Sequence, residues 1–131
     1  MSPFSLSNVL LVASGGAIGC LLRYYFQVVN FFHADEYYFT VGINITGCCL
    51  MGILWALFNH FGVATGWRLF LLTGVLGGYT TYSAFTLDAL LLLHDRLTLR
   101  FLFYVTMTLV GGLAGCAAGL YGTEKLLKIF G

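Results

Sequence analysis

Residues 73–83 read Thr-Gly-Val-Leu-Gly-Gly-Tyr-Thr-Thr-Tyr-Ser and lie in the middle of an apolar stretch. Three glycines within five residues disfavour a helix, each by roughly 1 kcal/mol relative to alanine. Because the segment contains no proline, we expect glycine to interrupt the helix here. Carbonyl groups freed by such a break suit a hard cation such as Na⁺, and freed N–H groups suit an anion. The alternative is a continuous helix with a glycine-lined packing face.

The composition around this segment is that of a membrane protein. The chain has 131 residues, of which 60% are hydrophobic and only 8% are charged. Soluble domains carry about 25% charged residues, which they need to cover their surface. A soluble globule and a disordered chain are therefore excluded. A formal net charge of +1 also excludes a nucleic-acid-binding protein.

Four stretches of the chain are long enough to span a membrane, since a span needs about 20 mostly apolar residues. They cover approximately residues 7–29, 38–58, 69–93 and 101–121, with short connections at 30–37, 59–68 and 94–100. The sequence predicts an all-α integral membrane protein with four transmembrane helices, the third broken at its Gly/Thr segment. Residues 1–131 are expected to form a single four-helix transmembrane domain.

The basic residues are evenly divided between the two predicted sides of the membrane. One side carries Arg68, Lys125 and Lys128, and the other carries Arg23, Arg96 and Arg100. Because an excess of Lys and Arg normally fixes orientation, this balance leaves two possibilities open. Either the chain inserts in both orientations and forms an antiparallel dual-topology homodimer, or a weak bias still fixes one topology.

Small residues recur at helical spacing in the predicted spans. Glycines are four or five residues apart at Gly15 and Gly19, at Gly42, Gly47 and Gly52, and at Gly111, Gly115 and Gly119. Such spacing predicts close helix packing in lipid. The four cysteines, Cys20, Cys48, Cys49 and Cys116, also lie in predicted spans and are interpreted as small apolar residues at helix contacts.

Several polar or aromatic side chains within the spans are candidates for a functional site. The Asn44 amide can donate to an anion or bond a neighbouring helix. Tyr82 and Phe85 share a helix face and have electropositive ring edges. Tyr104 and Thr108 give the last span two hydroxyls on one face, although such groups often bond their own helix.

Two charged residues, Arg23 and Asp88, lie inside predicted spans near the same side of the membrane. They can pair with each other or line a water-filled vestibule, and Arg23 can also extend to the interface. The sequence has no HExxH, P-loop or GxSxG motif, so we do not expect an enzyme.

Three motifs together resemble the CrcB/Fluc fluoride channel family. They are Gly-Gly-Ala-Ile-Gly-Cys-Leu-Leu-Arg-Tyr at 15–24, Asn-Ile-Thr-Gly at 44–47, and Gly-Val-Leu-Gly-Gly-Tyr-Thr-Thr-Tyr-Ser-Ala-Phe at 74–85. The resemblance implies a fluoride-selective passive channel in the bacterial inner membrane, which lets cytoplasmic fluoride out and lowers its toxicity. It also implies an antiparallel dual-topology homodimer.

The resemblance further implies roles for individual residues. A structural Na⁺ at the dimer centre would be held by the backbone carbonyls of Gly77 and Thr80. The fluoride pathway would be formed by the Asn44 amide, the ring edges of Tyr82 and Phe85, and the side chains of Ser83, Tyr104 and Thr108, with Arg23 at the vestibule. The family usually has Phe where this chain has Tyr82, and Gly112 stands where a hydroxyl is often found.

Two other functions are compatible with a small four-span protein. A small multidrug-type, proton-coupled cation exporter needs an embedded carboxylate, typically a Glu in the first span. Here the first predicted span has none, and the embedded acid is Asp88, near a helix end. A non-conducting accessory membrane subunit would need neither a broken helix nor a polar track.

Overall fold

The computed structural model describes residues 4–29 and 36–130, which form helices and short connections. The elements are α1 (Leu6–Val29), α2 (Glu36–His60), α3 (Thr65–Arg68), the π-helix η1 (Leu69–Leu76), α4 (Gly77–Tyr79), α5 (Tyr82–His94) and α6 (Thr98–Phe130). The predicted connection at 30–37 falls largely on residues 30–35, which lie outside the described ranges. The all-helical prediction is confirmed for the described residues.

Three of the helices, α1, α2 and α6, are long and apolar enough to cross a membrane. They contain the predicted spans 7–29, 38–58 and 101–121, and α6 continues well past the predicted end, to Phe130. Large apolar side chains such as Leu21 and Leu113 lie exposed on their surfaces. An apolar exterior of this extent is expected where lipid rather than water is the solvent.

The third predicted span, 69–93, is interrupted, but threonine rather than glycine makes the break. Thr80 (φ −76°, ψ 158°) and Thr81 (φ −150°, ψ 119°) have extended backbone between α4 and α5. Gly77, in contrast, is helical (φ −63°, ψ −36°). The prediction that glycine interrupts the helix is therefore wrong. β-Branched side chains favour extended backbone, which explains why the chain leaves the helix at this pair.

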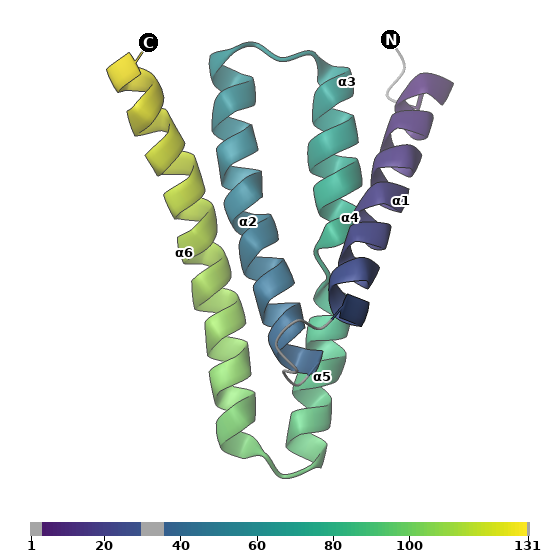
Figure 1. Cartoon of the computed structure of the whole chain (residues 1–131), viewed down its shortest axis with the longest axis vertical. Helices are drawn as coiled ribbons and strands as arrows, with labels where there is room; N and C mark the ends of the chain where they lie inside the picture. The colour runs from purple at the N-terminus through teal and green to yellow at the C-terminus, as the bar shows by residue number, and fades with distance from the viewer. Residues whose placement is uncertain (1–3, 30–35, 131) are drawn as a thin grey trace.

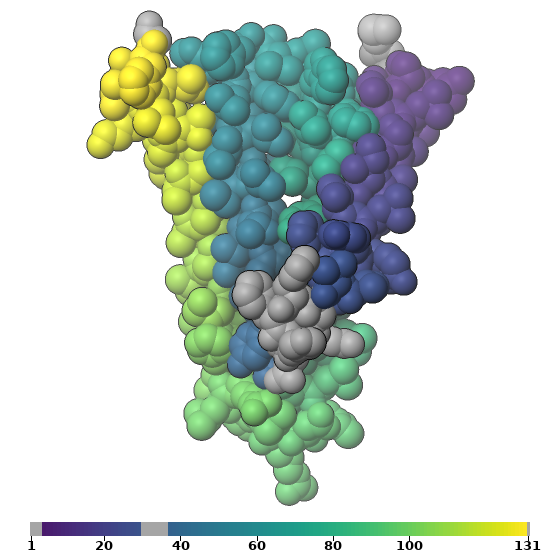
Figure 2. Space-filling view, in the orientation of Figure 1, coloured from purple at the N-terminus to yellow at the C-terminus, as the bar shows by residue number. Residues whose placement is uncertain are grey.

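The helices pack as two pairs that diverge toward one end of the molecule (Figure 1). One pair is α2 with α6, and in the other α1 lies along η1 and α4. The start of α1, the end of α6 and the α2–α3 connection lie at the wide end, whereas the α5–α6 turn forms the narrow end, as the space-filling view also shows (Figure 2). The break in the third span lies between the two pairs.

Glycines allow the two helices of each pair to pack closely, as the spacing of the glycines predicts. A Cβ at Gly19 would collide with the Val75 carbonyl, and one at Gly78 would lie 2.5 Å from the Gly16 carbonyl oxygen. In the other pair, a Cβ at Gly119 would collide with the Cys49 carbonyl. Not every repeated glycine has this role, because Gly42 has nothing within 4 Å of its Cβ position.

Arg68 fastens the connection between α2 and α3. Its guanidinium donates to the carbonyl oxygens of Phe58 (2.7 Å) and Val63 (3.2 Å) and to Asn59 Oδ1 (2.9 Å). The last carbonyls of a helix have no intrahelical donor, so a cationic side chain at this point satisfies them. These hydrogen bonds hold the α2–α3 connection in place, and the broken span begins directly after it.

Candidate functional site: a groove at the helix break

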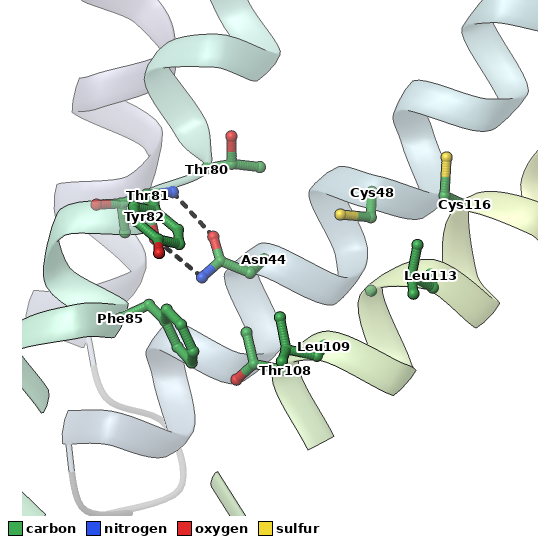
Figure 3. Close-up of a pocket in the computed structure, with 11 residues that line it drawn as sticks. Asn44, Cys48, Thr80, Thr81, Tyr82, Phe85, Thr108, Leu109, Leu113 and Cys116 are labelled. Carbon is green, nitrogen blue, oxygen red and sulfur yellow. Dashed lines mark hydrogen bonds between the residues drawn. The ribbon is translucent and has the colours of Figure 1, made fainter. Parts of the chain in front are cut away.

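The side chain of Asn44 binds the broken segment. Its Nδ2 donates to the Thr81 carbonyl oxygen (3.0 Å), and its Oδ1 accepts from the Thr81 N–H (2.8 Å) (Figure 3). Both residues are more than nine-tenths buried, at 9% and 8% exposure. Because buried backbone groups must be paired, this amide supplies what the neighbouring turn of a helix would have supplied. The Asn44 side chain therefore stabilises the break.

The two threonines of the break use their hydroxyls to terminate the flanking helices. Thr81 Oγ1 accepts from the Ala84 N–H (3.3 Å) and so caps the N-terminus of α5. Thr80 Oγ1 donates to the Leu76 carbonyl oxygen (2.9 Å) at the end of the preceding helical segment. The two threonine hydroxyls therefore contribute, together with the Asn44 amide, to ending one helix and beginning the next.

A groove of about 400 Å³ opens beside this break, between α2, α5 and α6 (Figure 3). The described residues that line it include no Asp, Glu, Lys or Arg. They are Asn44, Cys48, Thr80, Thr81, Tyr82, Phe85, Thr108, Leu109, Gly112, Leu113 and Cys116. The groove is thus electrically neutral, with an amide, hydroxyls, thiols and aromatic rings along its walls.

The aromatic side chains at the groove differ in burial. Tyr82 is 79% exposed and Phe85 only 9%, with their ring centroids 5.8 Å apart and the planes tilted by 45°. Phe85 also stacks on Tyr104, with centroids 5.5 Å apart and an interplanar angle of 28°. Phe85 is therefore held in position by the core, whereas the Tyr82 ring extends away from it.

The hydroxyls of the last helix do not form a ladder along the groove. Thr108 Oγ1 donates to the Tyr104 carbonyl oxygen of its own helix (2.8 Å), which is the alternative that its position allowed. The Tyr104 hydroxyl donates to Asp88 Oδ2 (3.0 Å), and Thr40 Oγ1 donates to the same oxygen (2.8 Å). Tyr104 therefore points toward Asp88 and is not among the residues that line the groove.

Pairing of Arg23 with Asp88, one of the alternatives that the sequence left open, is not found in the structure. Asp88 binds the hydroxyls of Thr40 and Tyr104, whereas Arg23 makes a 3.7 Å contact with Cys20 Sγ on its own helix. Hydroxyl donors on α2 and α6 already satisfy the Asp88 oxygen. The pairing hypothesis is corrected accordingly.

Four of the predicted fluoride-pathway residues line one groove, namely Asn44, Tyr82, Phe85 and Thr108. Ser83 lies just outside, exposed, with its hydroxyl 3.4 Å from Thr81 Oγ1. Tyr104 is behind the groove, under Phe85. Arg23 is not among the lining residues.

The sequence interpretation missed several residues of the groove, among them Thr81, Cys48 and Cys116. Thr81, the backbone partner of Asn44, was seen only as part of the broken segment. Cys48 and Cys116 were interpreted as helix contacts, yet both line the groove. The spacing of the cysteines could have predicted this position. Cys48 is four residues from Asn44 and Cys116 is eight residues from Thr108, so each cysteine lies on the same helix face as that groove residue.

The break also releases the backbone carbonyls that were expected to hold a cation. The Thr81 N–H, which a continuous helix would direct to the Gly77 carbonyl, is donated to Asn44. The Ala84 N–H, which would be directed to the Thr80 carbonyl, is donated to Thr81 Oγ1. Both carbonyls thus lose their helical donor, and oxygen ligands of this kind fit a hard cation such as Na⁺.

Comparison with known proteins identifies relatives of the whole chain. The sequence profile of the family described as "CrcB-like protein, Camphor Resistance (CrcB)" matches residues 10–120. The chain is similar to a protein of Rhizobium meliloti (strain 1021) named "Fluoride-specific ion channel FluC", with 39% identity over 118 residues, covering 88% of this chain and 94% of the relative. A protein of the same name from Caulobacter sp. (strain K31) is 34% identical over 128 residues, covering 95% of this chain and 100% of the relative. With three candidate membrane helices, the chain is a multi-pass bacterial membrane protein, and it belongs to the CrcB-like family.

Proposed function

We propose that this protein is a fluoride-selective passive ion channel, which lets fluoride leave the cytoplasm and lowers its toxicity. The observation that carries the proposal is the uncharged groove in which Asn44, Phe85 and Thr108 meet at a helix break. The names of its relatives, which describe fluoride-specific ion channels, support the same function. A channel needs no catalytic group, which agrees with the expectation that the protein is not an enzyme.

The walls of the groove offer what a small, strongly hydrated anion needs in place of water. The Asn44 amide has two N–H groups, and the hydrogen bond to Thr81 uses one of them. The Thr108 hydroxyl and the electropositive edges of Phe85 and Tyr82 lie along the same groove. In the proposed pathway the remaining Asn44 N–H and the ring edges act as weak donors, and the Thr108 hydroxyl donates to the ion in exchange for its bond to the Tyr104 carbonyl oxygen. Ser83 and Tyr104 contribute polar groups beside them.

The neutral lining also explains how the ion would be released. Conduction requires binding that is strong enough to replace hydration and weak enough to let the ion leave. A Lys or Arg in the groove would trap fluoride by direct charge attraction, and none is found among the described lining residues. We place Arg23 outside the narrow pathway, at a vestibule.

We propose further that the broken segment completes a fourth membrane crossing and that two chains form an antiparallel dual-topology homodimer. The start of α1 and the end of α6 lie at the same end of the molecule, which agrees with an even number of crossings (Figure 1). The balanced basic residues favour insertion in both orientations. Within one chain, Tyr82 is 79% exposed and Gly77 is also exposed, so this part of the break is available to a partner.

In this dimer, the carbonyls of Gly77 and Thr80 from both subunits would hold a structural Na⁺. Their loss of helical hydrogen-bond donors supports this assignment. The ion would supply a fixed positive charge that satisfies backbone oxygens at the centre of the membrane. The chain's own contribution is the pair of extended threonines that turns these oxygens out of the helix.

Fluoride efflux from liposomes containing the purified protein, read with a fluoride electrode, tests the proposed function. We expect rapid release of fluoride and no comparable release of chloride. A Thr108→Val substitution keeps the shape of the side chain and removes a groove hydroxyl, so it should slow the efflux. Thr106→Val, at an exposed position of the same helix, is the matched control and should leave efflux unchanged.

Equal release of chloride and fluoride, or no release of either, would overturn the proposal. A proton-coupled cation exporter would instead exchange organic cations for protons in the same liposomes, with a dependence on Asp88. An accessory subunit would transport neither ion, and substitutions in the groove would then change nothing.

A further inference from the structure

Two thiols lie in the part of the groove beyond Asn44 and Thr108. Cys48 is one helical turn from Asn44 on α2, and Cys116 is two turns from Thr108 on α6. All four residues line the same groove, and Figure 3 shows the two cysteines on the facing helices, with their sulfur atoms pointing in different directions. The structure contains no disulfide at either residue, so both are free thiols.

The absence of a side chain at Gly112 leaves space beside the Cys48 thiol, one turn before Cys116. A Cβ placed at Gly112 would lie 3.5 Å from Cys48 Sγ, so the Cys48 thiol borders the space that a larger residue would fill. Cys116 follows Gly112 by one turn on the same helix. The backbones are also close at this level, because a Cβ at Gly52 would collide with the Cys116 carbonyl.

This part of the groove otherwise lacks polar side chains. The described lining residues around the two thiols are Leu109, Gly112 and Leu113. Sulfur is therefore the available side-chain ligand there. Thiolate sulfur is a soft ligand, which selects soft cations over Na⁺, Mg²⁺ or Ca²⁺.

We propose that Cys48 and Cys116 form a two-thiol site for a soft, thiophilic cation of the Hg²⁺ or Ag⁺ type, and that occupation of this site closes the groove. With Hg²⁺, each thiol loses its proton to water and forms one S–Hg bond. Two protons are released, and no oxidation or reduction takes place. The product is a neutral dithiolate complex, which an apolar groove accommodates without burying a net charge.

The coordination number separates this site from a zinc site. Zn²⁺ in structural sites takes four ligands in a tetrahedron. Among the residues that the structure describes, no group of three or more His, Cys, Asp or Glu side chains is placed to hold a metal. A linear two-coordinate cation needs only the two sulfurs, so Hg²⁺ should bind where Zn²⁺ does not.

Binding is tested with HgCl₂ on the reduced, purified full-length chain, in the presence of an excess of a monothiol such as 2-mercaptoethanol. The competitor removes Hg²⁺ from single thiols, whereas two protein sulfurs on one ion resist it. Bound mercury is counted by mass spectrometry of the intact protein. The chain offers a matched control, because Cys20 and Cys49 are also free thiols in helices but do not line the groove.

We expect one mercury ion to be retained by the wild type and by the Cys20→Ala/Cys49→Ala variant. Cys48→Ala, Cys116→Ala and the double variant of these two should each lose it. Retention that follows Cys20 or Cys49, or that survives the loss of either groove cysteine, would overturn the two-thiol site. ZnCl₂ at the same concentration should not be retained.

Closure of the groove rests on the proposed channel function and has its own measurement. In liposomes, HgCl₂ should stop fluoride efflux by the wild type and by Cys20→Ala/Cys49→Ala, and not by Cys48→Ala/Cys116→Ala. Efflux that continues while mercury is retained would overturn closure but not binding. If the wild type releases no fluoride at all, the channel proposal fails, and the binding result still decides the thiol site.

Discussion

The side chain of Asn44 pairs with the backbone of Thr81 through both of its polar atoms, at 3.0 and 2.8 Å. These two residues are 37 positions apart in sequence, and their contact joins α2 to the break between α4 and α5. An amide side chain here reproduces the donor and acceptor of a peptide group. The same residue therefore keeps the backbone satisfied and presents its remaining N–H to the groove.

Replacing Asn44 with alanine should destabilise the protein strongly. The substitution leaves the buried N–H of Thr81 without its acceptor and removes one donor from the Thr81 carbonyl oxygen, and an unsatisfied buried group costs about 1–3 kcal/mol. We expect a clearly lower unfolding temperature in detergent, measured by circular dichroism. Asn59→Ala is the matched control, since it removes only one exposed hydrogen bond, from Arg68. Similar shifts for both variants would contradict the structural role of Asn44.

Two glycines of α6 should respond to alanine in opposite directions. At Gly119 a methyl group would collide with the Cys49 carbonyl, so Gly119→Ala should separate α2 from α6 and lower stability. At Gly122 nothing lies within 4 Å of the added Cβ, and alanine is a better helix former by about 1 kcal/mol. Thermal unfolding of the two variants tests this, and a loss of stability at Gly122 equal to that at Gly119 would refute the packing argument.

The hydroxyl of Thr81 should be required as a helix cap. Thr81→Val keeps the β-branched shape but removes the acceptor for the Ala84 N–H, which should cost about 1 kcal/mol. Thr81→Ser keeps the acceptor and should recover most of the difference. The comparison is made by thermal unfolding, and a serine variant no more stable than the valine variant would exclude the capping role.

The hydrogen bonds that Asp88 accepts from Thr40 and Tyr104 should stabilise the fold. Tyr104→Phe removes a hydrogen bond to this side chain, and hydrogen bonds to charged groups contribute about 1.5–3 kcal/mol. In an Asp88→Asn background the same substitution should cost less, which a double-mutant cycle of unfolding free energies measures. Tyr121→Phe, at an exposed position of the same helix, is the control. Additive effects of the two substitutions would argue against the bond.

The proposed sodium site makes a prediction about salts. An ion that binds only the folded dimer raises its stability as its concentration increases. The unfolding temperature should therefore rise with NaCl and saturate, whereas choline chloride at equal ionic strength should give no such rise. Thr80→Gly, which relaxes the extended backbone at one proposed ligand, should weaken the response. Identical behaviour in the two salts would count against a bound sodium.

Composition and hydropathy alone were sufficient to predict a helical membrane protein, because burial in lipid requires long apolar segments whose backbone is satisfied within the helix. The spacing of Gly15, Gly19 and Gly119 predicted close packing for the same local reason, that a missing side chain permits close approach. The motif at 74–85 predicted a broken helix, and together with the motifs at 15–24 and 44–47 it predicted the family. Properties of this kind depend on residues near each other in the chain.

The tertiary structure decided the features that depend on distant residues. The position of the break at Thr80 and Thr81, rather than at the glycines, depends on the Asn44 side chain that satisfies the extended backbone. The sequence could not predict the partners of Asp88 either. Thr40 lies 48 residues away and becomes a neighbour only when α2 packs beside α5 and α6. A buried polar group binds the donor or acceptor that packing brings within reach, and packing is a property of the whole fold.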